Sequence, residues 1–142
     1  MWPYFGTLCA IAFVLDVPWV VLNTKYGIYQ GIKTVRGNGA MAAAWIVIIM
    51  LNALLITSVV RYSQKRHTPL EVFFIGAFVG FVSYSTFNGT IVNIMQKWSF
   101  KMALIDTVWG VLLYGGAASL ASLAFHPWVQ TTENLGCCGQ PR

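Results

Sequence analysis

Two aspartates lie inside stretches of the sequence that are otherwise almost entirely apolar. Asp16 begins the segment Asp-Val-Pro-Trp, which ends at Trp19, and Asp106 begins Asp-Thr-Val-Trp, which ends at Trp109. A carboxylate at the centre of a membrane helix costs roughly 2.5–3.5 kcal/mol on insertion scales, so such an acid normally faces protein or water. Any chemistry that this chain performs is therefore expected at these two positions.

The composition of the chain predicts an integral membrane protein. Of its 142 residues, 57% are hydrophobic and only 9% are charged, whereas charged residues make up about a quarter of a soluble domain. The net charge of +5 is spread over the segments between apolar runs and is not gathered on one face. These basic residues are therefore interpreted as anchors for lipid headgroups, and no nucleic acid partner is expected.

Four apolar runs are long enough to cross a bilayer, which takes about 20 helical residues. The sequence predicts an all-α fold, a four-helix membrane bundle with short surface joins, in one domain over residues 1–126 with a polar tail over 127–142. The predicted spans cover residues 3–22, 40–60, 70–93 and 102–125. Aromatic residues fall at the predicted span ends, as in an interfacial belt: Trp2, Tyr26, Tyr29, Tyr62, Trp98 and Trp128.

The alternation of the spans predicts that the two acids share one leaflet. The first span ends just after Trp19 and the fourth begins just before Asp106, so both meet the same membrane surface. The second half of the third span is polar and approaches this surface too. We therefore expect a buried polar cluster, flanked by Trp19 and Trp109 and floored by Asn52. Its expected members are Asp16, Asp106, Tyr84, Thr86 and Asn88.

Small residues in the third and fourth spans predict close helix packing. Gly76 and Gly80 form a Gly-xxx-Gly pair, and Gly115 belongs to a strip of small residues in the fourth span. Such residues let membrane helices approach each other closely. We expect a Gly/Ala helix face, or the tail, to remain free for a protein partner or a second copy of the chain.

Four motifs together resemble an uncharacterised family of bacterial membrane proteins, the domain of unknown function 2177. They are the segments 13–19, 80–86, 97–101 and 106–110. The resemblance implies a four-span membrane fold, without an established activity, and a family that also has members in large DNA viruses. It further implies an acid at the position of Asn88 and an asparagine at that of Ile91, so this chain departs from the pattern at both.

The residues leave two classes of function open. In the first, the acids form a structural clamp inside a bundle that serves as a structural or assembly protein, in a viral membrane for example, linking it to an adjacent protein layer. In the second, Asp16 and Asp106 bind a proton or cation in a small transporter or channel. Catalytic motifs and metal-ligand spacings are absent from the sequence, so we expect no enzyme, no cofactor and no metal.

Overall fold

The computed structural model describes residues 2–26, 38–63, 67–94 and 98–131, and their side chains within 2–22, 43–63, 67–94 and 98–125. These residues form four helices: α1 (Trp2–Tyr26), α2 (Asn38–Tyr62), α3 (Pro69–Ile94) and α4 (Phe100–Thr131). Each contains a segment long and apolar enough to cross a membrane: Trp2–Leu22, Ala43–Tyr62, Pro69–Ile94 and Phe100–Phe125. The predicted all-α membrane bundle is confirmed.

The fourth helix is longer than the sequence predicts. α4 continues to Thr131, so its backbone is helical beyond residue 126, where the polar tail was expected to begin. The rest of that tail, residues 132–142, lies outside the described residues. So do residues 27–37, 64–66 and 95–97, which belong to the three joins between the helices.

The start of α3 is fixed by a capping box. The Thr68 hydroxyl accepts the Glu71 N–H at 3.3 Å, and a Glu71 carboxylate oxygen accepts the Thr68 N–H at 2.8 Å. Pro69 occupies the first helical position, where its missing N–H costs no hydrogen bond. Ser99 precedes α4 in a similar way, and its hydroxyl accepts the Met102 N–H at 3.3 Å. These caps set where α3 and α4 begin, the two helices that carry Asn88 and Asp106.

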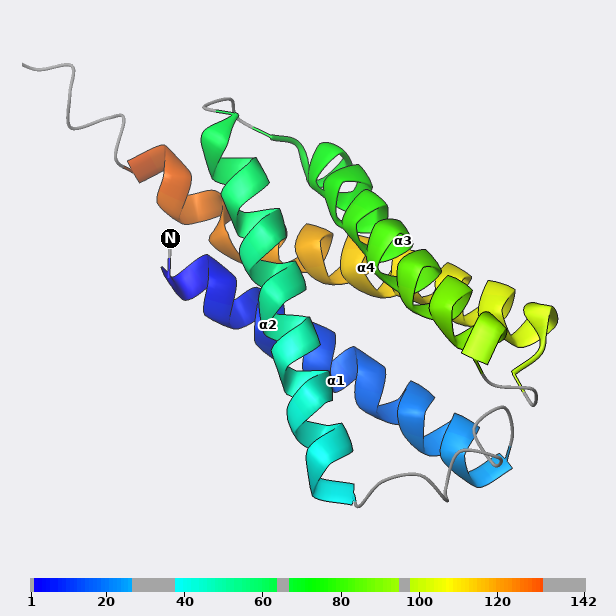
Figure 1. Cartoon of the computed structure of the whole chain (residues 1–142). Coiled ribbons are helices and arrows are strands. Elements are labelled where there is room, and N and C mark those ends of the chain that lie inside the picture. Colours follow the sequence, from blue (N-terminus) through cyan, green and yellow to red (C-terminus); the bar gives the residue numbers. More distant parts are fainter. Residues whose placement is uncertain (1, 27–37, 64–66, 95–97, 132–142) are drawn as a thin grey trace, which may run out of the picture.

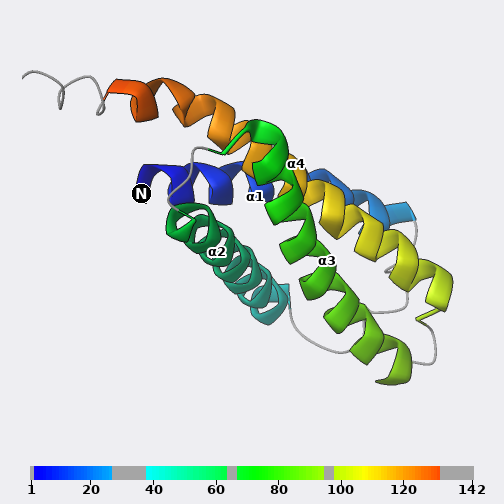
Figure 2. The same cartoon turned by 90° about the horizontal axis from the view of Figure 1, so that it is seen from above.

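The four helices pack in a ring in which α4 lies between α1 and α3, and α2 closes the other side (Figures 1 and 2). α3 and α4 run side by side along most of their length. In Figure 1 the first half of α2 diverges from α3. The core between α1, α2 and α4 is built from small and aliphatic side chains that are fully buried: Leu8, Ala12, Ala53, Ile56, Ala117 and Ala121.

Glycines hold α3 and α4 together, in what we call the glycine seam: Gly76, Gly80, Gly110 and Gly115. A Cβ added to Gly76 would overlap the Tyr114 carbonyl, and one added to Gly80 would overlap that of Gly110. A Cβ on Gly115 would lie 2.9 Å from the Phe73 ring. The Gly76 and Gly80 face is therefore occupied by α4 and is not the Gly/Ala helix face that was expected to remain free for a partner.

Candidate functional site: a carboxyl and indole network

Asp16 is held by two tryptophans that come from other helices. Its Oδ2 accepts the indole N–H of Trp45 on α2 at 2.6 Å, and its Oδ1 accepts that of Trp109 on α4 at 2.8 Å. Only 2% of the Asp16 surface is exposed. An indole nitrogen can only donate, so a carboxylate, which only accepts, matches both partners. Asp16 thereby connects three of the four helices.

Asp106 has a second set of donors. Its Oδ1 accepts the indole N–H of Trp19 on α1 at 3.4 Å, and its Oδ2 accepts the amide N–H of Asn88 on α3 at 3.0 Å. Asp106 is 3% exposed. The first bond is long for an N–H···O contact, which prefers 2.7–3.2 Å. Asp106 therefore depends more on α3 than on α1.

The two Asp-x-x-Trp segments exchange their partners. Residues three apart lie on one face of a helix, but neither carboxyl bonds the tryptophan of its own segment. Since α1 and α4 are antiparallel, Trp109 lies opposite Asp16 and Trp19 opposite Asp106. Between the two bonds, the Trp19 and Trp109 rings stack with centroids 4.6 Å apart and planes at 9°. The acids thus lie at one level of the bundle, joined by an indole pair.

Asn88 orders the α3 side of the network. Its carbonyl oxygen accepts the Trp98 indole N–H at 3.1 Å, which orients the amide so that its nitrogen points to α4. That nitrogen donates to Asp106 and also lies 3.3 Å from the Thr107 hydroxyl oxygen. Asn88 is 2% exposed and Trp98 is 5% exposed. Trp98 was expected in the interfacial belt, and the structure instead buries it with its N–H bonded to Asn88.

Two residues expected in the cluster are placed differently. Thr86 is exposed on the surface of α3, because its position on the helix points away from α4. Tyr84 is half-buried, and its ring rests on Gly110 and meets the Tyr114 ring edge to face at 6.3 Å. The structure therefore brings Asp16, Asp106, Asn88, Trp19 and Trp109 together and leaves Thr86 outside.

Asn52 forms a smaller polar contact nearer the core. Its carbonyl oxygen accepts the Ser83 hydroxyl at 2.6 Å, which connects α2 to α3. Its amide nitrogen is buried and has no hydrogen-bond partner, although Tyr114 lies beside the residue. Asn52 is 5% exposed. It bonds Ser83 and takes no part in the bonds to either acid.

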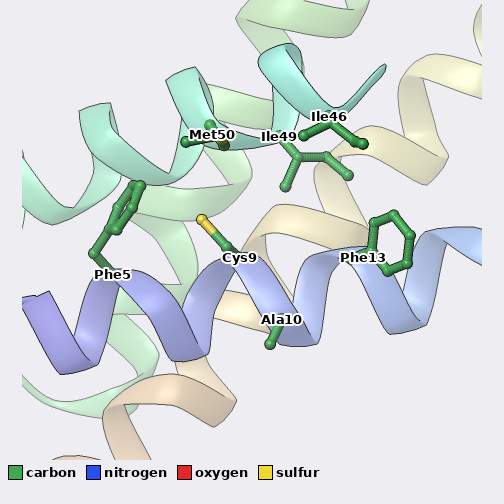
Figure 3. Close-up of a pocket in the computed structure, with 7 residues that line it drawn as sticks. All are labelled: Phe5, Cys9, Ala10, Phe13, Ile46, Ile49 and Met50. Atoms are coloured by element: carbon green, nitrogen blue, oxygen red, sulfur yellow. The ribbon is translucent and has the colours of Figure 1, made fainter. Parts of the chain in front are cut away.

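The hollow between α1 and α2 is separate from the acids and wholly apolar (Figure 3). It has a volume of about 390 Å³, and the Cys9 sulfur points into it from α1. At one end, Phe13 stacks on Trp45 at 4.9 Å. The lining residues are Phe5, Cys9, Ala10, Phe13, Ile46, Ile49 and Met50. Such a lining can contact hydrocarbon.

Two tryptophans of the network are missed by sequence reasoning. Trp45 stands alone in the second span and shares no motif with Asp16. Trp98 lies at a span end, where an interfacial position is the usual one. The one available signal is the number of buried acceptors: two carboxyls in lipid need several donors, and an indole N–H is a donor that cannot also act as an acceptor. Among the described residues, no group of three or more His, Cys, Asp or Glu could hold a metal ion.

One comparison with known proteins gives a match. A family model described as "Predicted membrane protein (DUF2177)" matches residues 2–123, which include the first three spans and all but the last two residues of the fourth. No curated protein and no solved structure matches the chain.

Proposed function

We propose, from the premise that this chain belongs to the family of predicted membrane proteins DUF2177, that it serves as a structural or assembly protein of a membrane. The observation that carries this proposal is that both carboxyls of the network accept two N–H donors each, from helices other than their own. Directional bonds of this kind fix four helices in one arrangement. A bundle of fixed shape suits a scaffold that presents its surface joins and its tail to an adjacent protein layer.

The strength of the network follows from the medium around it. A hydrogen bond to a charged acceptor contributes about 1.5–3 kcal/mol, and a buried acceptor that loses its donor also costs its desolvation. In hydrocarbon no water can replace a missing donor. Both carboxyls therefore favour the assembled bundle over any state in which one helix has moved away.

A small proton- or cation-coupled transporter is the second candidate. It is favoured by Asp16, a buried acid whose two partners, Trp45 and Trp109, are both neutral donors. Intramembrane acids often mark ion or proton pathways. For transport, however, the carboxyl must exchange partners during the cycle, whereas here three helices hold it.

The two candidates are separated by Asp16→Asn and Asp106→Asn. The asparagine side chain keeps one oxygen acceptor, but its NH2 group replaces the other oxygen and then faces an N–H donor. If the acids are structural, each variant should therefore lose about 2–4 kcal/mol in free energy of unfolding. The midpoint of thermal unfolding in one detergent measures this loss. Glu71→Gln is the matched control: it makes the same change at an exposed acid, and glutamine also completes a capping box.

The same variants are then reconstituted into liposomes under a pH or cation gradient. A structural protein gives no flux above that of empty liposomes, with or without the substitutions. Flux through the intact chain that disappears in both folded Asp→Asn variants and persists in Glu71→Gln would overturn the structural proposal and establish the transporter.

A further inference from the structure

One stripe of α3 changes its surroundings halfway along the helix. Residues at intervals of three, four or seven share a helix face. Val72 and Val79, on the first half of the stripe, are buried, and Ser83 bonds Asn52 of α2. Beyond Ser83 the same stripe continues through Thr86 and Thr90, and both are exposed. The face that α2 covers at one end of α3 is uncovered at the other.

The position of Trp45 explains why α2 leaves this face. The Ser83–Asn52 bond sets an antiparallel register in which the residue seven before Asn52 falls opposite Thr90. That residue is Trp45, and it turns to α1 instead, where it donates to Asp16 and stacks on Phe13. The first half of α2 therefore contacts α1 through Trp45 and diverges from α3 (Figure 1).

The uncovered part of α3 is polar although it lies within a membrane span. We call it the polar end face: the exposed residues Thr86, Gly89, Thr90 and Asn93, with the half-buried Ser85 at its edge. Thr86 lies eight residues before the end of α3 at Ile94, which at about 1.5 Å per residue places it roughly 12 Å along the helix from that end. A 26-residue helix exceeds a hydrocarbon layer of about 30 Å by only a few ångströms at each end. The deeper members of the face therefore lie among acyl chains.

The polar groups of this face are suited to a second helix. The Thr90 hydroxyl donates to the Thr86 carbonyl at 2.9 Å, and the Asn93 amide to the Gly89 carbonyl at 2.6 Å. Each hydroxyl oxygen can still accept, because a hydroxyl has two lone pairs as well as its donor. Gly89 has nothing within 4 Å of a Cβ position, so a neighbouring backbone can approach it as closely as α4 approaches Gly80.

We propose that the polar end face of α3 is the contact through which two copies of this chain pair, α3 against α3. A second copy inserted in the same orientation presents the same face at the same depth. The Asn93 amide keeps a second N–H that can donate across the contact, and the hydroxyl oxygens of the facing helix can accept it. The contact continues the interface that α3 already makes with α2. This inference goes beyond the proposed function and does not depend on it.

Cysteine cross-linking in liposomes tests the face directly. In a background with Cys9, Cys137 and Cys138 changed to alanine, Thr86→Cys is expected to form a disulfide-linked dimer on mild oxidation. Val108→Cys is the control, since Val108 is also exposed, 51% of its surface, on α4. It lies two residues after Asp106, which bonds Asn88, and thus near the depth of Thr86. Cross-linking at Val108 in preference to Thr86 would overturn the proposal.

Counting subunits tests the same contact without cysteines. Single-molecule photobleaching of the labelled chain at low protein-to-lipid ratio is expected to give mainly two steps for the intact chain and one step for Gly89→Leu. Gly6→Leu is the matched control, because Gly6 is also exposed in a span with open space at its Cβ position, and it should keep two steps. Equal thermal unfolding midpoints of the two variants establish that both fold.

Three results would contradict the proposal. The intact chain could give one bleaching step across the whole dilution series. Gly89→Leu and Gly6→Leu could pair equally well. The Thr86→Cys thiol of a monomeric chain could react with a membrane-impermeant maleimide, in which case the face lines water and does not pack against a second copy.

Discussion

The glycine seam and the carboxyl–indole network hold the same bundle in opposite ways. The seam brings α3 against α4 by removing side chains, so that backbone meets backbone at Gly76 and Gly80. The network holds α1 to α4 by adding large side chains, with Trp19 and Trp109 filling the space between the helices. The seam acts through short-range dispersion and the network through directional bonds. Each should therefore fail for a different reason: added volume in one case, a lost donor in the other.

Gly80→Leu should have the largest effect. A leucine there would drive its Cβ into the Gly110 carbonyl, and backbone cannot rotate away as a flexible side chain can. We expect the free energy of unfolding to fall by at least about 3 kcal/mol, which is the upper end of the range for overpacked cores, or the protein not to fold at all. Gly80→Ala, measured by thermal unfolding, should still be destabilising, whereas Gly116→Ala should gain up to about 1 kcal/mol because alanine favours helix and the site is open. Equal effects at both positions would mean that the seam is not close-packed.

Trp109→Phe should come next. Phenylalanine preserves a ring against Trp19 but removes the N–H that Asp16 Oδ1 accepts. A buried acceptor without its donor costs about 1.5–3 kcal/mol when it is charged. Trp2→Phe, at a tryptophan that is 71% exposed, serves as the control and should change the unfolding midpoint little. If Trp109→Phe left the unfolding midpoint unchanged, ring stacking and not the hydrogen bond to Asp16 would hold α1 to α4.

Asn52→Leu should have the smallest effect. The substitution gives up the Ser83 bond, but it also removes a buried amide nitrogen that has no hydrogen-bond partner. The freed Ser83 hydroxyl can donate to a carbonyl of its own helix, as serines in membrane helices do. We expect a change within about 1 kcal/mol in the same unfolding assay. A loss well beyond that would show that Asn52 belongs to the network after all.

Composition and run length were enough to predict the fold, because only helices or closed barrels satisfy the backbone in lipid. The importance of Asp16 and Asp106 follows from the same reasoning about buried charge. Their partners do not, since residues three apart share one face of a helix, and this spacing alone would place each acid beside the tryptophan of its own segment. The exchange between α1 and α4 depends on how two antiparallel helices face each other, which no local spacing encodes.

The misplaced residues have a similar explanation. Thr86 lies in the polar half of the third span, but it is two residues from the buried Asn88, and at 3.6 residues per turn that places it about 200° around the helix. The third span is only weakly amphipathic, because polar residues lie on opposite faces of the helix. Sequence predicts that a polar cluster exists there, whereas the close approach at Gly110 decides which side of α3 enters it.

The exchange of partners also imposes an order on biosynthesis. Asp16 emerges from the ribosome 93 residues ahead of Trp109, an interval on the order of 5 to 20 s at common rates of translation. Of the two tryptophans that donate to Asp16 in the folded protein, only Trp45, 29 residues after Asp16, is synthesised early in that interval. Asp106, in contrast, is synthesised after Trp19 and Asn88. The first two helices of the growing chain thus carry an acid that lacks one of its two indole donors until Trp109 has been synthesised and inserted.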